Sequence, residues 1–425
     1  MIWLLTALMA QDPQPTELEK LRREVEELKR RLPPEPEGDL PRKAAEEAAR
    51  KAGGVYAKPF LARFGRGVYV GGYMDLEYFN VENSDSGDTF DQHRFVPFFY
   101  ADISPHVKLA AEVEIEHGNG TELGVEFATL DYWMCDEFNF RAGIILLPLG
   151  HFNLVHDAPF QDLTRRPLVD EIIIPAVLRD PGIGFFGSFD LDPWLILYEI
   201  YVTNGFKGLG PNNVITRDKG LRDARPHEDK VTGTKKYRDF NQNKAVTARI
   251  AVSPFLGVEL GASGHTGKYD LGADNDLTVY AVDGTIAMGG LYNALFEGEG
   301  IVRDIFFATE IVFEKARANI DRNAAATAAG VPGDFDGWFG EIRVHFLPAF
   351  LQPVFKVGDE STFTLVFRKE GIDTDGDRRT RRAVGLNYRP TEDTVFKIEF
   401  EWNGEGGLRA KTDNDAFIFS FASYF

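Results

Sequence analysis

The sequence predicts an all-β fold, a transmembrane antiparallel β-barrel of about sixteen strands (eighteen being the second choice), preceded by a short coiled-coil helix. Three observations predict this fold. The chain ends on an alternating strand whose last residue is aromatic, and most of it consists of short segments in which apolar and charged residues alternate. After the first few residues, no apolar run approaches the about 18 residues that a membrane-spanning helix needs. Such alternation gives a strand one face for lipid and one for water.

The C-terminal strand is the most specific of these signals. Side chains alternate between the two faces of a strand, so Phe417, Phe419, Phe421 and Phe425 share one face. The segment resembles the terminal recognition strand of outer-membrane proteins, in which the barrel-assembly machinery reads a C-terminal aromatic residue. We therefore expect Phe421 and Phe425 to be the assembly signal and the last strand to close the barrel.

The composition fits one large β unit. The 425 residues include 35 Phe and 42 Gly, yet 27% are charged. The formal net charge is −19, and it arises in residues 67–425, because residues 11–66 carry slightly more basic than acidic groups. This acidity argues against a nucleic-acid partner, since phosphate contacts need an electropositive surface. The one cysteine, Cys135, excludes an internal disulfide and a multi-cysteine metal site.

Two segments flank a predicted helix before the barrel. Residues 1–10 resemble the apolar core and cleavage end of a secretory signal, although they are short and lack a basic start. An ordinary N-terminus is the alternative for these residues. Residues 34–66 begin with a proline-rich stretch and are predicted to be a periplasmic linker.

Residues 11–33 are predicted to form a coiled-coil helix. Apolar side chains recur there with heptad spacing between charged flanks. The repeat covers only about two heptads, so a single solvated amphipathic helix is the alternative. Subunits already associated through barrels would concentrate such helices locally. The predicted seam residues are Leu18, Leu21, Val25, Leu28 and Leu32.

Residues 67–425 are read as the barrel. In one segment, for example, Phe396, Ile398 and Phe400 alternate with Lys397 and Glu399. Seventeen segments fit the pattern, but a single-chain bacterial barrel needs an even number, so one of those near residues 275–298 is expected to be superfluous. The candidate strands are residues 67–81, 93–103, 106–117, 122–133, 138–147, 182–190, 194–204, 242–252, 255–267, 275–287, 289–298, 304–316, 335–347, 361–371, 381–389, 393–403 and 415–425.

The connection at residues 148–181 is the candidate constriction loop. It lies between two convincing strands and is rich in charged, proline and aromatic residues. Long connections without regular structure are usually functional or disordered, and in a barrel such a loop can fold inward to narrow the pore. An external loop with solvated charges is an equally weighted alternative. The charged residues expected to set the local field are Arg165, Arg166, Arg179, Asp157, Asp162 and Asp170.

The charged faces of the strands supply candidates for the lumen. Basic and acidic side chains occur there together, so these residues do not predict whether a pore would prefer anions or cations. The lumen-facing candidates are Arg343, Arg368, Arg389, Lys397, Glu112, Glu114, Glu126, Glu399 and Glu401.

The order of parts resembles the phosphate-selective porin family. The signal-like start, the leucine heptads, Gly71-Gly72-Tyr73, and Arg141-Ala142-Gly143 leading to Leu147-Pro148-Leu149-Gly150 carry the resemblance. It covers nearly the whole chain in architecture, but its motifs are loose. The resemblance implies sixteen-stranded trimers, an inward loop after the Pro-Gly segment and anion selectivity from lumenal Arg and Lys. The acidity of residues 67–425 departs from what an anion filter needs.

The expected function is passive diffusion of small hydrophilic solutes or ions through an outer-membrane porin, with anions such as phosphate as one option. The alternative is a structural tether that links the outer membrane of a Gram-negative-type bacterium to the cell wall through a periplasmic N-terminal helix. The expected partners are outer-membrane lipids, two further copies in a homotrimer, the barrel-assembly machinery and the transported solutes. No cofactor is expected.

Catalytic and metal-site readings find little support in the sequence. Asp373-Thr374-Asp375-Gly376-Asp377 begins like a calcium loop, but the remaining ligand spacing is missing. His151 and His156 lie five residues apart in one loop, which is too little for a metal site without a third ligand. No serine stands beside a persuasive base, so the chain is not expected to be an enzyme.

Overall fold

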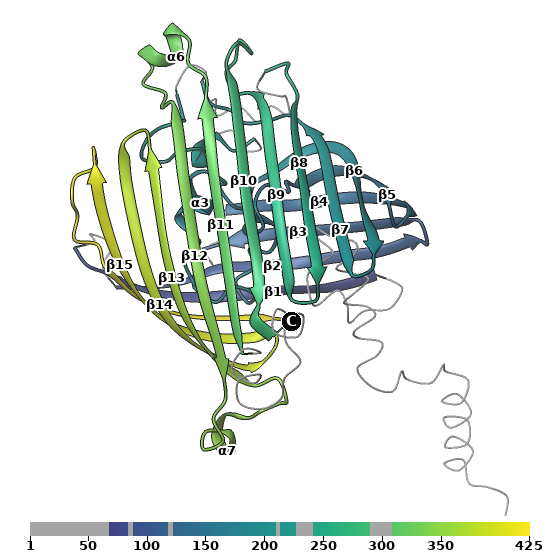
Figure 1. Cartoon of the computed structure of the whole chain (residues 1–425), viewed down its shortest axis with the longest axis vertical. Coiled ribbons are helices and arrows are strands. Elements are labelled where there is room, and N and C mark those ends of the chain that lie inside the picture. The colour runs from purple at the N-terminus through teal and green to yellow at the C-terminus, as the bar shows by residue number, and fades with distance from the viewer. Residues whose placement is uncertain (1–67, 84–87, 118–121, 210–212, 227–240, 290–307) are drawn as a thin grey trace, which may run out of the picture. The chain divides into compact units, whose positions relative to one another are not determined.

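The computed structural model describes residues 68–83, 88–117, 122–209, 213–226, 241–289 and 308–425. Sixteen antiparallel strands close into a barrel, each strand pairs with its neighbours in sequence, and β1 pairs with β16 (Figure 1). The predicted all-β antiparallel barrel and the preferred strand number are therefore confirmed. The signal-like segment 1–10, the coiled-coil helix 11–33 and the linker 34–66 lie outside the described residues.

The strands are long enough to cross a bilayer when tilted. Within the described ranges, no helix is both long and apolar enough to cross a membrane. The helices are α3 (Leu168–Ile172), α6 (Ala324–Ala328) and α7 (Gln352–Phe355). The strands are β1 (Val68–Val81), β2 (Thr89–Ser104), β3 (Val107–Glu116), β4 (Glu122–Cys135), β5 (Phe138–Leu146), β6 (Arg179–Leu191), β7 (Trp194–Thr203), β8 (Ala245–Phe255), β9 (Val258–Lys268), β10 (Asp276–Ala287), β11 (Thr309–Ile320), β12 (Asp334–Phe346), β13 (Thr362–Thr374), β14 (Asp377–Thr391), β15 (Thr394–Gly407) and β16 (Ala416–Tyr424).

Of the candidate strand 289–298, only residue 289 belongs to the described residues. Strand β10 pairs directly with β11 from Leu277↔Ile320 to Ala287↔Glu310, so no further strand stands between them in the barrel. Of the predicted strand 304–316, the described part corresponds to β11, which runs from Thr309 to Ile320 and so ends four residues later than expected. Alternation identifies strands well but leaves their ends uncertain wherever a connection contains apolar residues.

The two faces of the barrel wall are inverted relative to a water-soluble protein. On β15, Phe400 and Trp402 point outward and are 48% and 49% exposed, whereas Glu399 and Glu401 point inward and are 0% and 1% exposed. The same alternation recurs around the barrel. An apolar exterior around a charged interior is stable only where the exterior faces lipid.

Aromatic side chains form a belt around one end of the outer wall. The rings of Phe346, Phe363, Tyr388, Phe396 and Phe421 follow one another across β12 to β16, with successive centroids 5.9, 5.0, 6.3 and 4.8 Å apart. Such belts mark the membrane–water interface of transmembrane barrels.

The chain end closes the barrel beside this belt. The amide of Phe425 donates to the carbonyl of Gly72 at 2.9 Å, and the amide of Gly72 donates back at 3.2 Å. The ring of Phe425 stacks on Phe95 with centroids 5.6 Å apart. Gly72 is required for this approach, because a Cβ there would lie 2.4 Å from the carbonyl oxygen of Val96 and 2.8 Å from the Phe425 ring.

The two ends of the barrel differ in their connections, but not as cleanly as the sequence suggested. Residues 136–137, 192–193 and 392–393 are two-residue turns at the end that carries Phe425. The connection at residues 347–361 lies at that same end and is long. It contains α7, whose Phe355 packs on Phe363 and Tyr388 at 5.1 and 5.2 Å, so the segment folds back against the outside of the wall.

Candidate functional site

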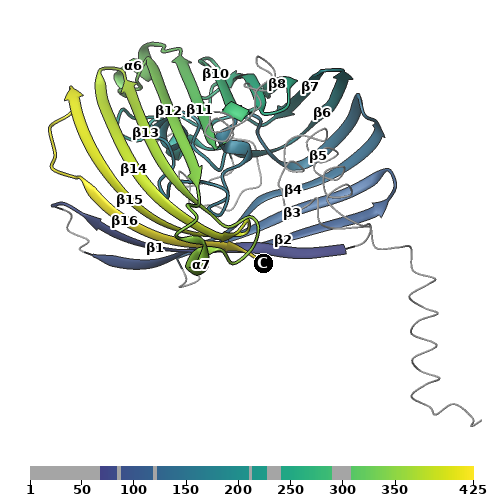
Figure 2. The same cartoon turned by 60° about the horizontal axis from the view of Figure 1, so that its bottom comes forward.

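The β5–β6 loop, residues 147–178, lies inside the barrel. Its short helix α3 contacts β11, β12 and β13 on the far side from β5 (Figures 1 and 2). Val169 and Ile173 are fully buried and share a hydrophobic cluster with Phe335 and Phe339 of the inner wall. Gly337 leaves room for them, since a Cβ there would lie 3.0 Å from Ile173. The apolar run from Leu168 to Ile174 is therefore explained by docking within the barrel, not by an exposed loop.

Charged side chains of the wall bind the backbone of the β5–β6 loop. Carboxylates accept from loop amides, and cationic side chains donate to loop carbonyls, which satisfies backbone groups far from bulk water. The contacts are His151 N to Glu314 Oε2 at 2.8 Å, Thr164 N to Glu399 Oε2 at 2.8 Å, Lys397 Nζ to the Ala158 carbonyl at 2.8 Å, Arg389 to the Pro159 carbonyl at 2.7 Å and Arg368 to the Arg165 carbonyl at 2.7 Å.

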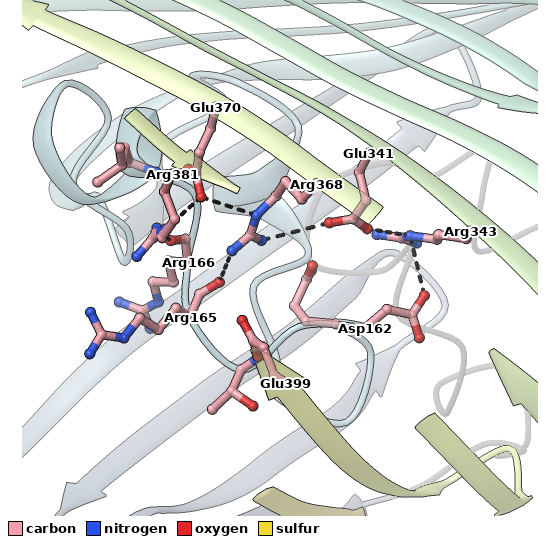
Figure 3. Close-up of polar contacts among 12 residues, drawn as sticks. Asp162, Arg165, Arg166, Glu341, Arg343, Arg368, Glu370, Arg381 and Glu399 are labelled. Carbon is pink, nitrogen blue, oxygen red and sulfur yellow. Dashed lines mark hydrogen bonds and ion pairs between the residues drawn. The ribbon is translucent and has the colours of Figure 1, made fainter. Parts of the chain in front are cut away.

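A charge ladder runs along the inner wall of β12 to β14, formed by Arg343, Glu341, Arg368, Glu370 and Arg381 (Figure 3). Strand register creates it, because Glu341 lies directly opposite Arg368 and Glu370 directly opposite Arg381. The successive N–O distances along the ladder are 2.6, 3.6, 3.3 and 2.6 Å. Arg368 is thus held between two carboxylates of the ladder, and the end arginines, Arg343 and Arg381, contact Asp162 and Glu401 outside it.

Asp162 joins the β5–β6 loop to this ladder. Its carboxylate lies 3.2 Å from Arg343 Nε and accepts a hydrogen bond from Arg389 at 3.0 Å. Burial would raise the pKa of Asp162, but the guanidinium groups of Arg343 and Arg389 outweigh it and hold the pKa well below its usual range. Asp162 therefore stays ionised, and its negative charge attaches the loop to Arg343 and Arg389 of the wall.

The two loop arginines have different partners. Arg165 Nε lies 3.4 Å from Glu401, and its guanidinium carbon lies 5.2 Å from the ring centroid of Phe79. Arg166 donates to the carbonyl of Ala176 within the loop, and its own carbonyl accepts from Arg381 at 2.5 Å. Glu401 thus compensates the charge of Arg165, whereas Arg166 makes no ion pair within 4 Å among the described residues and interacts with Glu114 and Glu126 electrostatically at longer range.

The remaining loop candidates have different surroundings. Asp157 accepts from the hydroxyl of Tyr424 at 3.0 Å. Asp170 on α3 is fully buried. Arg179 does not belong to the loop: it is the first residue of β6 and pairs with Leu146. The predicted boundary at residue 181 was therefore wrong, because the strand extends three residues further toward the loop than its alternating part suggested.

The structure places the other lumen-facing candidates on the inner wall. Arg343, Arg368, Arg389 and Lys397 contact the loop or its ladder, as above. Glu112, Glu114 and Glu126 lie on β3 and β4 and are at most 8% exposed. The two clusters face different parts of the β5–β6 loop.

A cavity of about 340 Å³ separates part of the β5–β6 loop from the wall of β8 to β13. Acidic and basic groups converge on it, among them Glu259, Glu310 and Arg343. The cavity gives water and small ions space next to the loop.

A second segment inside the barrel was missed in the sequence. Described residues of the β7–β8 connection pack on the β5–β6 loop, where Leu221 N donates to the Ile172 carbonyl at 2.8 Å. Phe206, Ile215 and Leu221 join the same hydrophobic cluster as α3. The sequence did contain an indication of this packing, because the inner face of β10 and β11 is apolar. Strands that face only a water-filled lumen would carry polar side chains there. The apolar residues of this inner face include Leu277, Val279, Ala281, Ala316, Ala318 and Ile320.

Comparisons with known proteins agree on the fold. No protein-family model matches the chain. The anion-selective porin from Comamonas acidovorans superposes with a TM-score of 0.54 at 10% identity, covering 84% of this chain and 99% of that one. The trimeric form of OmpT, an outer-membrane protein of Vibrio cholerae, superposes with a TM-score of 0.50 at 12% identity, covering 84% and 99%. The chain has a porin fold.

One curated protein is similar in sequence. An uncharacterized protein of Aquifex aeolicus (strain VF5) is 31% identical over 222 residues, which make up 51% of this chain and 43% of that protein. The match thus spans less than half the length of the relative. The superpositions on porins of known structure establish the porin fold and leave solute and selectivity to be argued from the residues of this chain.

Proposed function

We propose that the chain forms a water-filled diffusion channel in the outer membrane, through which small hydrophilic solutes and ions pass down their gradients. The observation that carries this proposal is the inverted wall: apolar and aromatic residues outside, and a charged interior with a loop folded into it. In this reading the β5–β6 loop sets the size limit and the charges around it set the ion preference.

We further propose that the channel prefers cations. Buried carboxylates outnumber buried Arg and Lys side chains among the described residues. The arginines of the charge ladder, together with Arg165 and Arg389, are paired with carboxylates. The Comamonas porin is anion-selective, but at 10% identity its selectivity does not carry over to this chain. Phosphate selectivity, which the family resemblance implies, would need guanidinium groups free of such pairing.

The decisive experiment is the reversal potential of the purified full-length protein in a planar bilayer under a salt gradient, followed by titration with phosphate. A stable conductance with a cation-selective reversal potential is the expected result. An anion-selective potential together with block by phosphate would favour the phosphate-porin reading instead. Lack of conductance in protein shown to be folded would favour the tether, which depends on residues 11–66 outside the described ranges.

Two associated predictions belong to the same proposal. The trimeric state of the superposed Vibrio protein and the architecture of the resembled family favour a homotrimer. The predicted absence of catalysis also remains a prediction, and hydrolase assays on the folded protein test it.

A further inference from the structure

A buried cluster of three carboxylates and one imidazole lies where the β5–β6 loop meets β3 and β4. Glu112 and Glu126 come from the wall, His156 and Asp157 from the loop, and none is more than 2% exposed. One ligand atom from each of Glu112, His156 and Asp157 can be chosen so that all lie within 4.8 Å of one another. Nε2 of His156 lies 3.3 Å from Glu126 and 3.9 Å from Asp157.

The imidazole is oriented as in metal sites. Nδ1 of His156 lies 2.8 Å from the carbonyl oxygen of Asn153, and because a carbonyl only accepts, Nδ1 carries the proton. Nε2 faces the carboxylates and donates to Oε2 of Glu126 at 3.3 Å, so a metal ion bound there would displace that proton and take the lone pair. Metal-binding histidines commonly use a backbone carbonyl in this way to fix the tautomer and the ring orientation.

Tyrosine side chains around the cluster contribute further polar groups. The hydroxyl of Tyr424 donates to Asp157 at 3.0 Å, and that of Tyr100 donates to Glu112 at 3.4 Å. Tyr73 is fully buried, its hydroxyl has no hydrogen-bond partner among the described residues, and it interacts electrostatically with Glu126, Arg94 and Asp157. A buried hydroxyl without a hydrogen-bond partner beside these carboxylates is a group that an added polar ligand would satisfy.

A second acidic cluster provides a contrast. Asp75, Glu77 and His93 also lie close enough together to share an ion. There the guanidinium of Arg94 already serves as the cation, with one nitrogen 3.3 Å from Asp75 and another 3.3 Å from Nε2 of His93. That imidazole nitrogen accepts from Arg94, so it has no lone pair left for a metal.

We propose that Glu112, His156 and Asp157, with Glu126 beside them, bind one divalent transition-metal cation that locks the β5–β6 loop to the barrel wall. One imidazole nitrogen with carboxylate oxygens is a donor set suited to zinc and similar ions. Because two ligand residues belong to the loop and two to the wall, the site is complete only when the loop is docked. Ion binding therefore stabilises the docked loop.

The test is Zn²⁺ binding to the folded full-length protein, measured by equilibrium dialysis and mass spectrometry of the metal, with heat-modifiable gel mobility as the check on folding. We expect one Zn²⁺ per chain in the wild type, loss of that ion in His156→Ala, and at least about tenfold weaker binding in Asp157→Asn. His151→Ala in the same loop and His93→Ala in the contrasting cluster are matched controls that should keep the ion.

Three outcomes would overturn the proposal: no Zn²⁺ on folded wild-type protein, equal binding by wild type and His156→Ala, or loss of the ion in His93→Ala instead. Protection of the loop from protease by Zn²⁺ in the wild type, absent in His156→Ala, is the expected result for the locking role. Equal protease sensitivity with and without Zn²⁺ would contradict that role. Neither measurement depends on conductance, so the site and the proposed channel can fail separately.

Discussion

At the scale of single residues, Asp162 decides the charge balance around the β5–β6 loop. It neutralises Arg343 and Arg389, which lie on different strands. Replacing Asp162 with Asn should leave both guanidinium groups with less compensation, and the reversal potential should move toward anions by a few-fold change in permeability ratio. The measurement is the same salt-gradient experiment in a planar bilayer.

The matched control is Asp359→Asn. Asp359 has a 95% exposed side chain and lies on the connection that folds against the outside of the wall. This variant should keep the wild-type reversal potential. If Asp162→Asn also keeps it while its barrel is folded, ions do not pass close to Asp162.

At the scale of elements, α3 and the wall behave as one packed unit. Replacing Ile173 with Asp would bury a charge without a partner in the hydrophobic cluster and should undock the loop. Single-channel conductance should then rise, because the loop no longer narrows the lumen. Thr327→Asp on the exposed face of α6 is the control. A folded Ile173→Asp barrel with unchanged conductance would argue against a constriction role.

The docking of α3 should also depend on pH. Burial raises the pKa of Asp170 well above its usual range, and the neighbouring carboxylate of Glu314 raises it further. An undocked Asp170 would titrate near about 3.9, so between about pH 4 and the raised pKa the docked state binds more protons. Docking therefore weakens as the pH rises through this window, by up to about 1.4 kcal/mol per pH unit for one group.

Protease sensitivity of the β5–β6 loop as a function of pH measures this effect. Wild-type sensitivity should increase as the pH rises through the window. Asp170→Asn should flatten the dependence, since an amide does not titrate. A variant with the wild-type pH profile would show that another group controls docking.

At the scale of the whole molecule, closure depends on the chain end. Phe425 pairs with Gly72 through two backbone hydrogen bonds and stacks on Phe95. Deleting Phe425 should lower the amount of folded protein in the outer membrane severalfold, because both the closing contact and the expected assembly signal are lost. Phe350→Ala is the control, since Phe350 is 79% exposed on the outer connection. Normal membrane levels after deletion would contradict the assembly role.

The sequence by itself determined those features that follow from the alternation of apolar and polar residues along a single strand. Alternation along β15 identifies its lipid and lumen faces without knowledge of any neighbour, and the same holds for the closing strand. An even strand number then restricts the count to values near sixteen. The start of β6 at Arg179 was misplaced, because the residues at the end of a strand do not follow this alternation.

Only the tertiary structure decided which charges meet. The charge ladder depends on cross-strand register, which brings Glu341 opposite Arg368 although 27 positions separate them in the sequence. His156 had no third ligand nearby in sequence, and the fold places Glu112 and Glu126 beside it. The sequence left open whether residues 148–178 fold inward. The apolar inner face of β10 to β12 is explained only by the helix that docks on it, and that docking is visible only in the structure. Contacts of this kind depend on barrel closure, a long-range property that no local pattern encodes.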